Sequence, residues 1–323
     1  MTNVKIGNIS IKKKGVLGPM LEYTTHPYRL LCNEYDCGLC FSEMVYINQL
    51  VYAPESLNNS SLLNSSKKDS PSAFQLVGDF SDSVLSLKAV EFIDNYNFFD
   101  IIDFNTGCPS NRVINGNSGS GLLKNIDSIL STLKNAKGIS KKPITVKTRL
   151  GFDKVDIFNN VEKLVNTGID AITIHARKAI DSNNISSDYN IVRKLKKEFS
   201  LPIIYNGDIT DDNFFEFFDF DLLMVSRNAL GNPFVFKKIN YFEKKNSFLE
   251  KNFLENLNAL KRFHEIEKKN PINFVKKKNM ALQFIKDFQG ASFFRNKICV
   301  SKSDSDLEKI FIEIEHKLLE LQQ

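Results

Sequence analysis

Eight short apolar segments, each ending in or near polar residues, alternate with helix-like segments and constrain the fold more than any other feature. We predict strands at residues 15–20, 41–45, 73–78, 98–105, 143–149, 171–177, 202–208 and 221–227. We predict helices at 27–35, 81–95, 125–137 (ended by Gly138), 156–167, 189–198 and 211–218, and a surface loop at 58–72. Short buried strands alternating with helices are typical of a parallel sheet with helical crossovers, which indicates the α/β class.

The polar residues at the strand ends distinguish between two parallel architectures. Eight units in about 230 residues match the usual size of a (β/α)8 barrel, and a doubly wound open sheet is the alternative. The polar residues are Glu43, Gln75, Asn105, Lys147, His175, Asn206 and Arg227. In a barrel the carboxyl ends of all strands surround one mouth, so these side chains would form one site. We therefore predict a TIM barrel.

The last quarter of the chain has a different pattern. From about residue 241 the strands stop, and segments 252–268, 273–288 and 305–321 are predicted to be helical. We predict a barrel domain at 1–240 and a small helical domain at 241–323. Residues 261–302 carry a local charge of +8 within a chain of net charge +5, which leaves the remainder slightly acidic. This stretch is either a polyanion-binding surface or a solvated helical face.

The cysteines and the apolar segments exclude several classes of protein. Five cysteines at irregular spacing do not form a disulfide framework. Cys37 and Cys40 form a single CxxC without other ligands at zinc spacing, so we expect buried thiols and no metal. The first 14 residues lack an apolar signal core, and no run of eighteen apolar residues occurs. We expect a cytoplasmic protein without a membrane partner, acting as a monomer.

Cys108 is the candidate reactive side chain. It lies between Gly107 and Pro109, after the predicted strand at 98–105 and before the small-residue loop at 115–121. An unperturbed thiol has a pKa of about 8.5, so it is protonated at neutral pH and can act as a general acid. A covalent nucleophile and an inert buried cysteine are the alternatives. The position in a rigid loop after a strand favours a reactive role.

Two further groups of residues predict a cofactor site. Asn206, Gly207 and Asp208 follow the seventh strand, and Ser226 and Arg227 follow the eighth, where barrels often bind phosphate. Ordinary turn chemistry is the alternative interpretation.

Gln75, Lys147 and His175 would face the same mouth. An amide, an ammonium and an imidazole match the acceptors and the N–H donor of a flavin ring. A structural role for His175 is the alternative.

These pieces together resemble the tRNA dihydrouridine synthase family along nearly the whole chain. The matching segments are Gly18-Pro19-Met20, Ser42-Glu43-Met44-Val45, Gln75-Leu76-Val77-Gly78, Asp103-Phe104-Asn105-Thr106-Gly107-Cys108-Pro109, Val146-Lys147-Thr148-Arg149, His175-Ala176-Arg177, Asn206-Gly207-Asp208-Ile209 and Ser226-Arg227. The resemblance implies reduction of FMN by NADPH, or alternatively by NADH. It further implies hydride transfer from reduced FMN to C6 of a tRNA uracil and protonation of C5 by the loop cysteine.

The resemblance also implies roles for individual residues. Cys108 would be the general acid. FMN would be lined by Pro19, Met20, Gln75, Lys147, His175, Asn206, Gly207, Asp208, Ser226 and Arg227. Asn105, Arg149 and Arg177 would lie near the flavin or hold the uracil. The helical domain would grip tRNA, with Lys276, Lys277, Lys278, Arg295 and Lys297 as candidate phosphate contacts.

The chain departs from the family pattern at a few positions. Gly18 and Ser42 replace the commoner Ala and Thr, and Ser226 stands where Gly is usual before the arginine. The C-terminal resemblance is loose. Two other functions share part of the pattern: a small-molecule FMN oxidoreductase of the dihydropyrimidine or dihydroorotate type, and a flavin-free RNA-binding protein. The uracil must be unstacked, so we expect a target in the D-loop or another single-stranded region.

Overall fold

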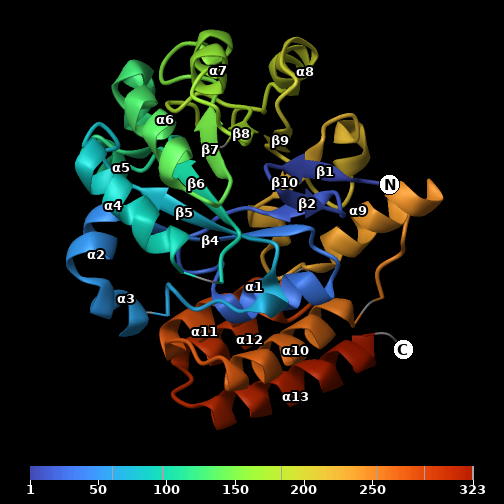
Figure 1. Ribbon diagram of the computed structural model, residues 1–323. Helices are drawn as coiled ribbons and strands as arrows, with labels where there is room; N and C mark the ends of the chain where they lie inside the picture. Colours follow the sequence, from blue (N-terminus) through green and yellow to red (C-terminus); the bar gives the residue numbers. More distant parts are fainter. Residues whose placement is uncertain (60, 97, 183, 253, 287, 322–323) are drawn as a thin grey trace.

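The computed structural model describes residues 1–59, 61–96, 98–182, 184–252, 254–286 and 288–321. Eight parallel strands close into a barrel in the order β10-β3-β4-β5-β6-β7-β8-β9 (Figure 1). They are β3 (Gly15–Leu17), β4 (Leu39–Tyr46), β5 (Ser72–Val77), β6 (Ile101–Asn105), β7 (Ile144–Arg149), β8 (Ala171–His175), β9 (Ile203–Asn206) and β10 (Leu222–Val225). The predicted barrel is confirmed, and the open sheet is wrong because β10 pairs with β3.

Helices surround the barrel and form a separate layer at the C-terminal end of the chain. The barrel helices are α1 (His26–Glu34), α2 (Ile47–Tyr52), α3 (Pro54–Asn59), α4 (Ser83–Asp94), α5 (Asn111–Ile114), α6 (Leu130–Ile139), α7 (Ile157–Val165), α8 (Tyr189–Glu198) and α9 (Phe234–Lys245). The others are α10 (Glu255–Lys269), α11 (Phe274–Phe284), α12 (Ala291–Val300) and α13 (Asp304–Leu321). In Figure 1, α10 to α13 lie together beside α1. Tyr28 of α1 makes edge contacts with Phe263 and Phe284, which attaches this layer to the barrel.

An N-terminal hairpin that the sequence analysis missed closes the bottom of the barrel. Strands β1 (Val4–Ile6) and β2 (Ile9–Ile11) pair antiparallel around Gly7, whose φ of +57° suits a tight turn. Ile6 and Ile11 are buried with the inward-facing apolar residues of the barrel strands. Both arms alternate apolar and polar residues around the two-residue turn Gly7-Asn8, a hairpin signal that the sequence analysis overlooked.

Two apolar cores stabilise the fold. The inner core consists of Ile6, Ile11, Val16, Leu39, Phe41, Ala73, Ile101, Ala171, Ile204, Leu222 and Met224. The larger core fills the space between the strands and the surrounding helices and continues into the C-terminal layer. Toward the carboxyl ends of the strands the barrel interior becomes polar, with Gln75, Asp103, Thr145 and Thr173 all buried. This change in polarity positions the site.

Several predicted boundaries were wrong for local reasons. The helix predicted to end at Gly138 runs through Ile139 in α6, because the Asp94 carboxylate accepts from the backbone of Lys141 and Lys142 beyond it. The helix predicted at 211–218 is only a 3-10 turn, Phe214–Phe217. The Asn213 side chain accepts from the Thr210 N–H and donates to the Asp208 carbonyl, which holds the preceding residues in a turn.

The predicted loop at 58–72 contains more structure than expected. Helix α3 reaches Asn59, a 3-10 turn covers Lys67–Asp69, and β5 begins at Ser72. Asp69 is fully buried and pairs with Arg29 of α1, with 2.9 Å between the charged groups. The segment is therefore anchored to the barrel by an ion pair that composition alone does not reveal.

The C-terminal segment is helical, as predicted, but the bounds and the number of its helices differ from the prediction. Helix α11 ends at Phe284, and α12 follows it as an element that was not predicted. Residues 253 and 287, which the predicted helices included, lie outside the described residues, and so does the charge of Asp287 in the local count. Helix α9 spans residue 240, and the division of the chain into 1–240 and 241–323 stays a prediction.

Candidate functional site at the barrel mouth

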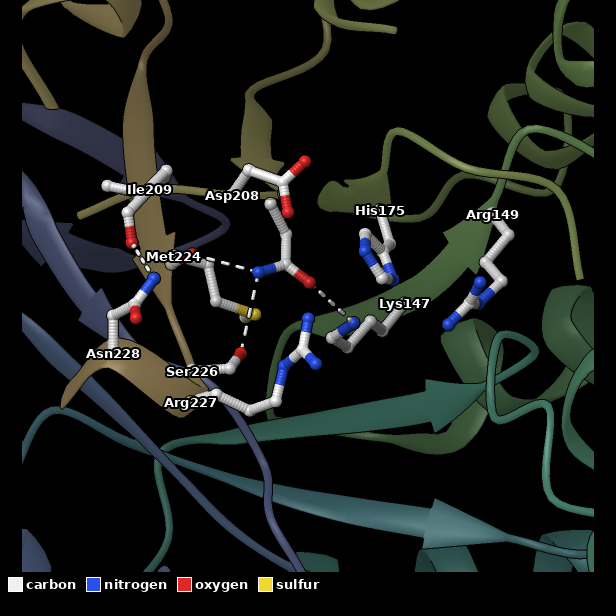
Figure 2. A pocket seen from close by; sticks show the side chains of 11 residues that line it. Lys147, Arg149, His175, Asp208, Ile209, Met224, Ser226, Arg227 and Asn228 are labelled. Carbon is white, nitrogen blue, oxygen red and sulfur yellow. Dashed lines mark hydrogen bonds between the residues drawn. The ribbon is translucent and has the colours of Figure 1, made fainter. Parts of the chain in front are cut away.

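A cavity of about 500 Å³ opens at the carboxyl ends of β7 to β10 (Figure 2). It is lined by Lys147, Arg149, His175, Asn206, Gly207, Asp208, Ile209, Met224, Ser226, Arg227 and Asn228. Eight of these were predicted from sequence as site residues, and they come from four strands far apart in the chain. Ile209, Met224 and Asn228 were missed, although each is adjacent or next-but-one to a predicted residue.

Lys147 stands at the centre of the cavity wall. Its Nζ donates to Oδ1 of Asn206 over 3.1 Å, the contact drawn as a dashed line in Figure 2. Burial and the neighbouring Arg149 lower the pKa of Lys147 to about 8, against which the carboxylate of Asp103 acts. Asn206 in turn donates to the backbone oxygen of Met224, so its amide is held in one orientation. Two of the three ammonium hydrogens of Lys147 are thus available to a ligand.

His175 is a neutral imidazole in this site. Burial and the nearby cations, Lys147 first, lower its pKa to about 2. Its Nε2 lies 3.1 Å from Nη1 of Arg177, which can only donate, so Nε2 accepts and Nδ1 carries the proton. Arg177 is buried, and its Nη2 donates to both carboxylate oxygens of Asp208, over 2.6 Å and 2.7 Å. This pair neutralises the one carboxylate that lines the cavity.

The corner formed by Gly207 and Arg227 suits an anion. Gly207 has a φ of +143°, and a β-carbon there would lie 2.9 Å from Cβ of Ser187, so a larger residue would disturb the turn. Arg227 is exposed at the rim, and in the described part of the chain its guanidinium has neither an ion-pair nor a hydrogen-bond partner. With Asp208 paired to Arg177, the side chains that line the cavity carry a net positive charge, from Lys147, Arg149 and Arg227.

The loop that carries Cys108 is held by Asn105. Oδ1 of Asn105, at the end of β6, accepts from the backbone N–H groups of Gly107 and Cys108 over 3.0 Å and 2.9 Å. On the other side, Nε of Arg149 donates to the backbone oxygen of Gly107 over 2.8 Å. Cys108 is half-buried. The thiol therefore projects from a fixed loop.

Gln75, predicted as a flavin contact, lies buried on β5 and already has two partners. Its Nε2 donates to Oδ2 of Asp103 over 2.8 Å, and its Oε1 accepts from Nδ2 of Asn105 over 2.9 Å. One N–H and one lone pair of the amide remain for a ligand. Pro19 and Met20 lie half-buried in the loop after β3, outside the residues that line the cavity.

The five basic residues predicted to contact phosphate all have partners within the protein. Lys276 pairs with the buried Glu43 of the barrel over 3.0 Å, and Lys277 pairs with Glu267 and Asp304. Of the other three, Lys278 and Arg295 donate to backbone oxygens, whereas Lys297 pairs with an acid. Lys278 donates to the backbone oxygens of Cys299 and Ser301, Arg295 to those of Leu282 and Ile285, and Lys297 pairs with Glu313.

The site fits a flavin phosphate by the chemistry of its donors. Cationic side chains, a positive-φ glycine turn and a neutral imidazole surround a space large enough for a ligand of that size class. Among the described residues, no group of three or more His, Cys, Asp or Glu side chains is arranged to hold a metal ion. Likewise, none of the described helices has the length and apolar character required to cross a membrane.

Comparison with known proteins decides the family. Residues 16–320 match the family described as dihydrouridine synthase (Dus). The chain belongs to the dihydrouridine synthase family. The resemblance noted from the strand-end motifs is thus confirmed, and the chain is a flavin-dependent oxidoreductase.

Relatives of this chain include two bacterial proteins. The tRNA-dihydrouridine synthase B of Pasteurella multocida is 31% identical over 280 residues, covering 82% of each chain. The tRNA-dihydrouridine synthase B of Vibrio cholerae is 31% identical over 245 residues, covering 74% of each chain. Among solved structures, an old yellow enzyme homologue from Zymomonas mobilis superposes with a TM-score of 0.54 at 11% identity, covering 79% of this chain and 95% of its own. That likeness concerns the fold alone.

Proposed function

We propose that this chain is an NADPH-dependent tRNA-dihydrouridine synthase that reduces the C5–C6 double bond of specific uridines. The observation that carries the proposal is the junction of two features at one barrel mouth. Cys108 is not itself a lining residue, but its loop accepts a hydrogen bond at Gly107 from Arg149, which lines the cavity together with the cationic Lys147 and Arg227. Relatives whose alignments cover 82% and 74% of this chain are named tRNA-dihydrouridine synthase B.

The residues that would hold FMN follow from the donors. From the cavity lining, Gly207 and Arg227 would bind its phosphate, Lys147, His175 and Asn206 would face the ring, and Asp208 and Ser226 would adjoin it. Gln75, Pro19 and Met20, which lie outside that lining, would complete the site. Reduced FMN would supply the hydride for C6 of the uracil. Lys147 keeps a positive charge at pH 7, because its pKa is about 8, and so favours an anionic group beside it.

Cys108 would deliver the proton to C5. Asn105 and Arg149 bind the two polar groups of the Gly107–Cys108 peptide that carries the thiol, so proton transfer would need no rearrangement of this peptide. Nε and Nη1 of Arg149 donate to backbone oxygens, and Nη2 would donate to a uracil oxygen. Arg177 would act through the orientation of His175.

The tRNA would reach the site with one base unstacked. Flipping costs a few kcal/mol and least in loops, and phosphate contacts can offset that cost. We keep Lys276, Lys277, Lys278, Arg295 and Lys297 as candidates for these contacts. Lys278 and Arg295 are the stronger candidates, because they donate to backbone oxygens and their charges are not paired with an acid. Lys276 and Lys277 already neutralise buried carboxylates.

The proposal is tested with purified protein and defined RNA. The protein should carry flavin absorbance, oxidise NADPH faster than NADH, and introduce dihydrouridine into an unmodified tRNA transcript at discrete positions found by mass spectrometry. Cells that lack the gene should lose dihydrouridine at those positions. Reduction of free uracil or oxidation of dihydroorotate, with no product in tRNA, would replace the proposal with a small-molecule oxidoreductase. A colourless protein that binds RNA would exclude the flavin reaction.

A further inference from the structure

A chain of buried hydrogen bonds connects Asp103, inside the barrel, to the backbone of Cys108. Oδ2 of Asp103 accepts from Nε2 of Gln75, and Oε1 of Gln75 accepts from Nδ2 of Asn105. Oδ1 of Asn105 then accepts from the N–H groups of Gly107 and Cys108. The strands explain the alignment, since Gln75 and Asp103 are register partners on β5 and β6, and Asn105 follows Asp103 by two residues on the same face.

The two ends of this chain leave only one orientation for each amide. A carboxylate can only accept, and backbone N–H groups can only donate. Gln75 must therefore turn its nitrogen toward Asp103, and Asn105 must turn its oxygen toward the Cys108 loop. If Gln75 were reversed, its nitrogen would face the nitrogen of Asn105, and Asn105 would have to reverse as well. Its nitrogen would then face the two backbone donors, and the loop would lose both hydrogen bonds.

Asp103 is costly to keep in this position. It is fully buried, and burial raises its pKa to about 6, although Thr145 and Gln75 donate to it. The same barrel interior is filled by apolar side chains one layer below. A side chain needed only to fill space would be cheaper as an apolar residue. Asp103 is not among the residues that line the cavity, and its carboxylate is occupied by Gln75 and Thr145.

We propose that Asp103 is a positioning residue for Cys108, which fixes the loop by setting the orientation of the Gln75 and Asn105 amides. This inference rests on the proposed function only for its consequence, which is proton delivery to the uracil. The hydrogen-bond chain itself is a property of the protein without flavin or tRNA. The two can therefore be tested separately.

The direct measurement is hydrogen exchange of the Cys108 amide. Labelling with ¹⁵N-cysteine gives five backbone amides in the full-length protein, and the Cys108 signal is identified by its loss in Cys108→Ala. Asp103→Leu should accelerate exchange of the Cys108 amide about tenfold or more, because its acceptor is no longer oriented. The Cys40 amide, which donates to the backbone oxygen of Pro71, should keep its rate and reports on the barrel itself.

Two matched variants separate positioning from general damage. Asp103→Asn should keep the Cys108 rate within about twofold, since its oxygen can still accept from Gln75 while its nitrogen donates to the Thr145 hydroxyl. Thr145→Val removes the other partner of Asp103 and leaves the chain to Cys108 intact, so it should also keep that rate. If Asp103→Leu does not fold, Gln75→Leu interrupts the same chain one step later and should show the same acceleration.

Two results would overturn the inference. One is an unchanged Cys108 rate in Asp103→Leu or, failing that, in Gln75→Leu. The other is equal acceleration of Cys40 and Cys108, which would indicate a merely structural carboxylate. With tRNA, Asp103→Leu should slow dihydrouridine formation about tenfold while flavin reduction by NADPH stays within about twofold. If wild-type protein makes no dihydrouridine while the exchange pattern holds, the proposed function fails and the positioning role stands.

Discussion

Gly18 and Ser226 share a space that only one of them can fill. A β-carbon on Gly18 would lie 2.3 Å from Oγ of Ser226 and 3.0 Å from the Met224 side chain. The two residues follow β3 and β10, the strands whose pairing closes the barrel, and the Gly18 N–H donates to the backbone oxygen of Val225. Both positions depart from the family pattern. Gly18 is smaller than the usual residue and Ser226 is larger, so the two departures compensate each other.

Gly18→Ala should destabilise the protein unless Ser226 is shortened as well. The added methyl group forces the Ser226 hydroxyl to rotate away from Asn206, and we expect the free energy of unfolding to fall by about 1–2 kcal/mol. The double variant with Ser226→Gly should recover most of that loss. Urea unfolding of the four proteins gives the coupling energy, and simple additivity of the two single changes would contradict the shared space.

Cys108→Ala should separate the two halves of the proposed reaction. The substitution leaves Asn105 its backbone partners, so the loop keeps its hydrogen bonds while the thiol proton is lost. Flavin content and NADPH oxidation should be retained, and dihydrouridine formation should fall by at least about a hundredfold, the usual contribution of a general acid. Single-turnover reduction of tRNA under anaerobic conditions measures the loss. Turnover equal to that of the wild type would remove Cys108 from the acid role.

Lys147 should make the stability of the flavin-free protein depend on alkaline pH. Its pKa in the folded state is lowered to about 8 from 10.5, chiefly by burial. Between these values the unfolded chain holds a proton that the folded chain has released, so folding becomes more favourable as pH rises. Across this pH window the free energy of unfolding of the wild type should rise, relative to that of Lys147→Met, by at most about 3 kcal/mol. The measured rise should be smaller than this limit, because the ammonium faces an open cavity.

Urea unfolding at pH 7.5, 9 and 10.5 provides the comparison for Lys147. The free energy of unfolding of the wild type, relative to that of Lys147→Met, should be lowest at pH 7.5 and should increase toward pH 10.5. The same substitution at the exposed Lys154 is the matched control for removal of a lysine. A difference for Lys147 that does not change with pH would contradict the lowered pKa.

The barrel and the residues of its mouth could be predicted because strand and helix have different periods and barrel strand ends converge. Periodicity carries no information on which polar side chains bind each other. Asp103 was therefore visible only as part of a motif, and its contact with Gln75 depends on the register of β5 and β6. The pairing of Lys276 with Glu43 joins residues 233 positions apart. Composition marked Lys276 as a surface charge, and only tertiary packing shows that it compensates a buried acid.

Lys277 and Lys278, adjacent in sequence, should separate a structural lysine from an RNA contact. Lys277 is 6% exposed and pairs with Glu267, which is 1% exposed, and with Asp304. Lys277→Met leaves the Glu267 carboxylate buried without its cation, so the free energy of unfolding should fall by about 3–5 kcal/mol. Lys278 donates to backbone oxygens and lies 5.5 Å from the centre of the Phe274 ring, and it compensates no buried acid, so Lys278→Met should change the free energy of unfolding by about 0.5 kcal/mol or less.

The binding of tRNA should show the opposite order for these two lysines. If Lys278 neutralises a phosphate, Lys278→Met lowers the dependence of log K on log salt by about 1 and weakens binding to all tRNAs alike. Filter binding at several salt concentrations, on proteins whose folding has been checked by urea titration, measures both quantities. A Lys277→Met protein as stable as wild type that binds tRNA with a reduced salt slope would instead place Lys277 on the phosphate backbone. It would also show that the Glu267 pair contributes little, since a buried acid cannot lose its cation without cost.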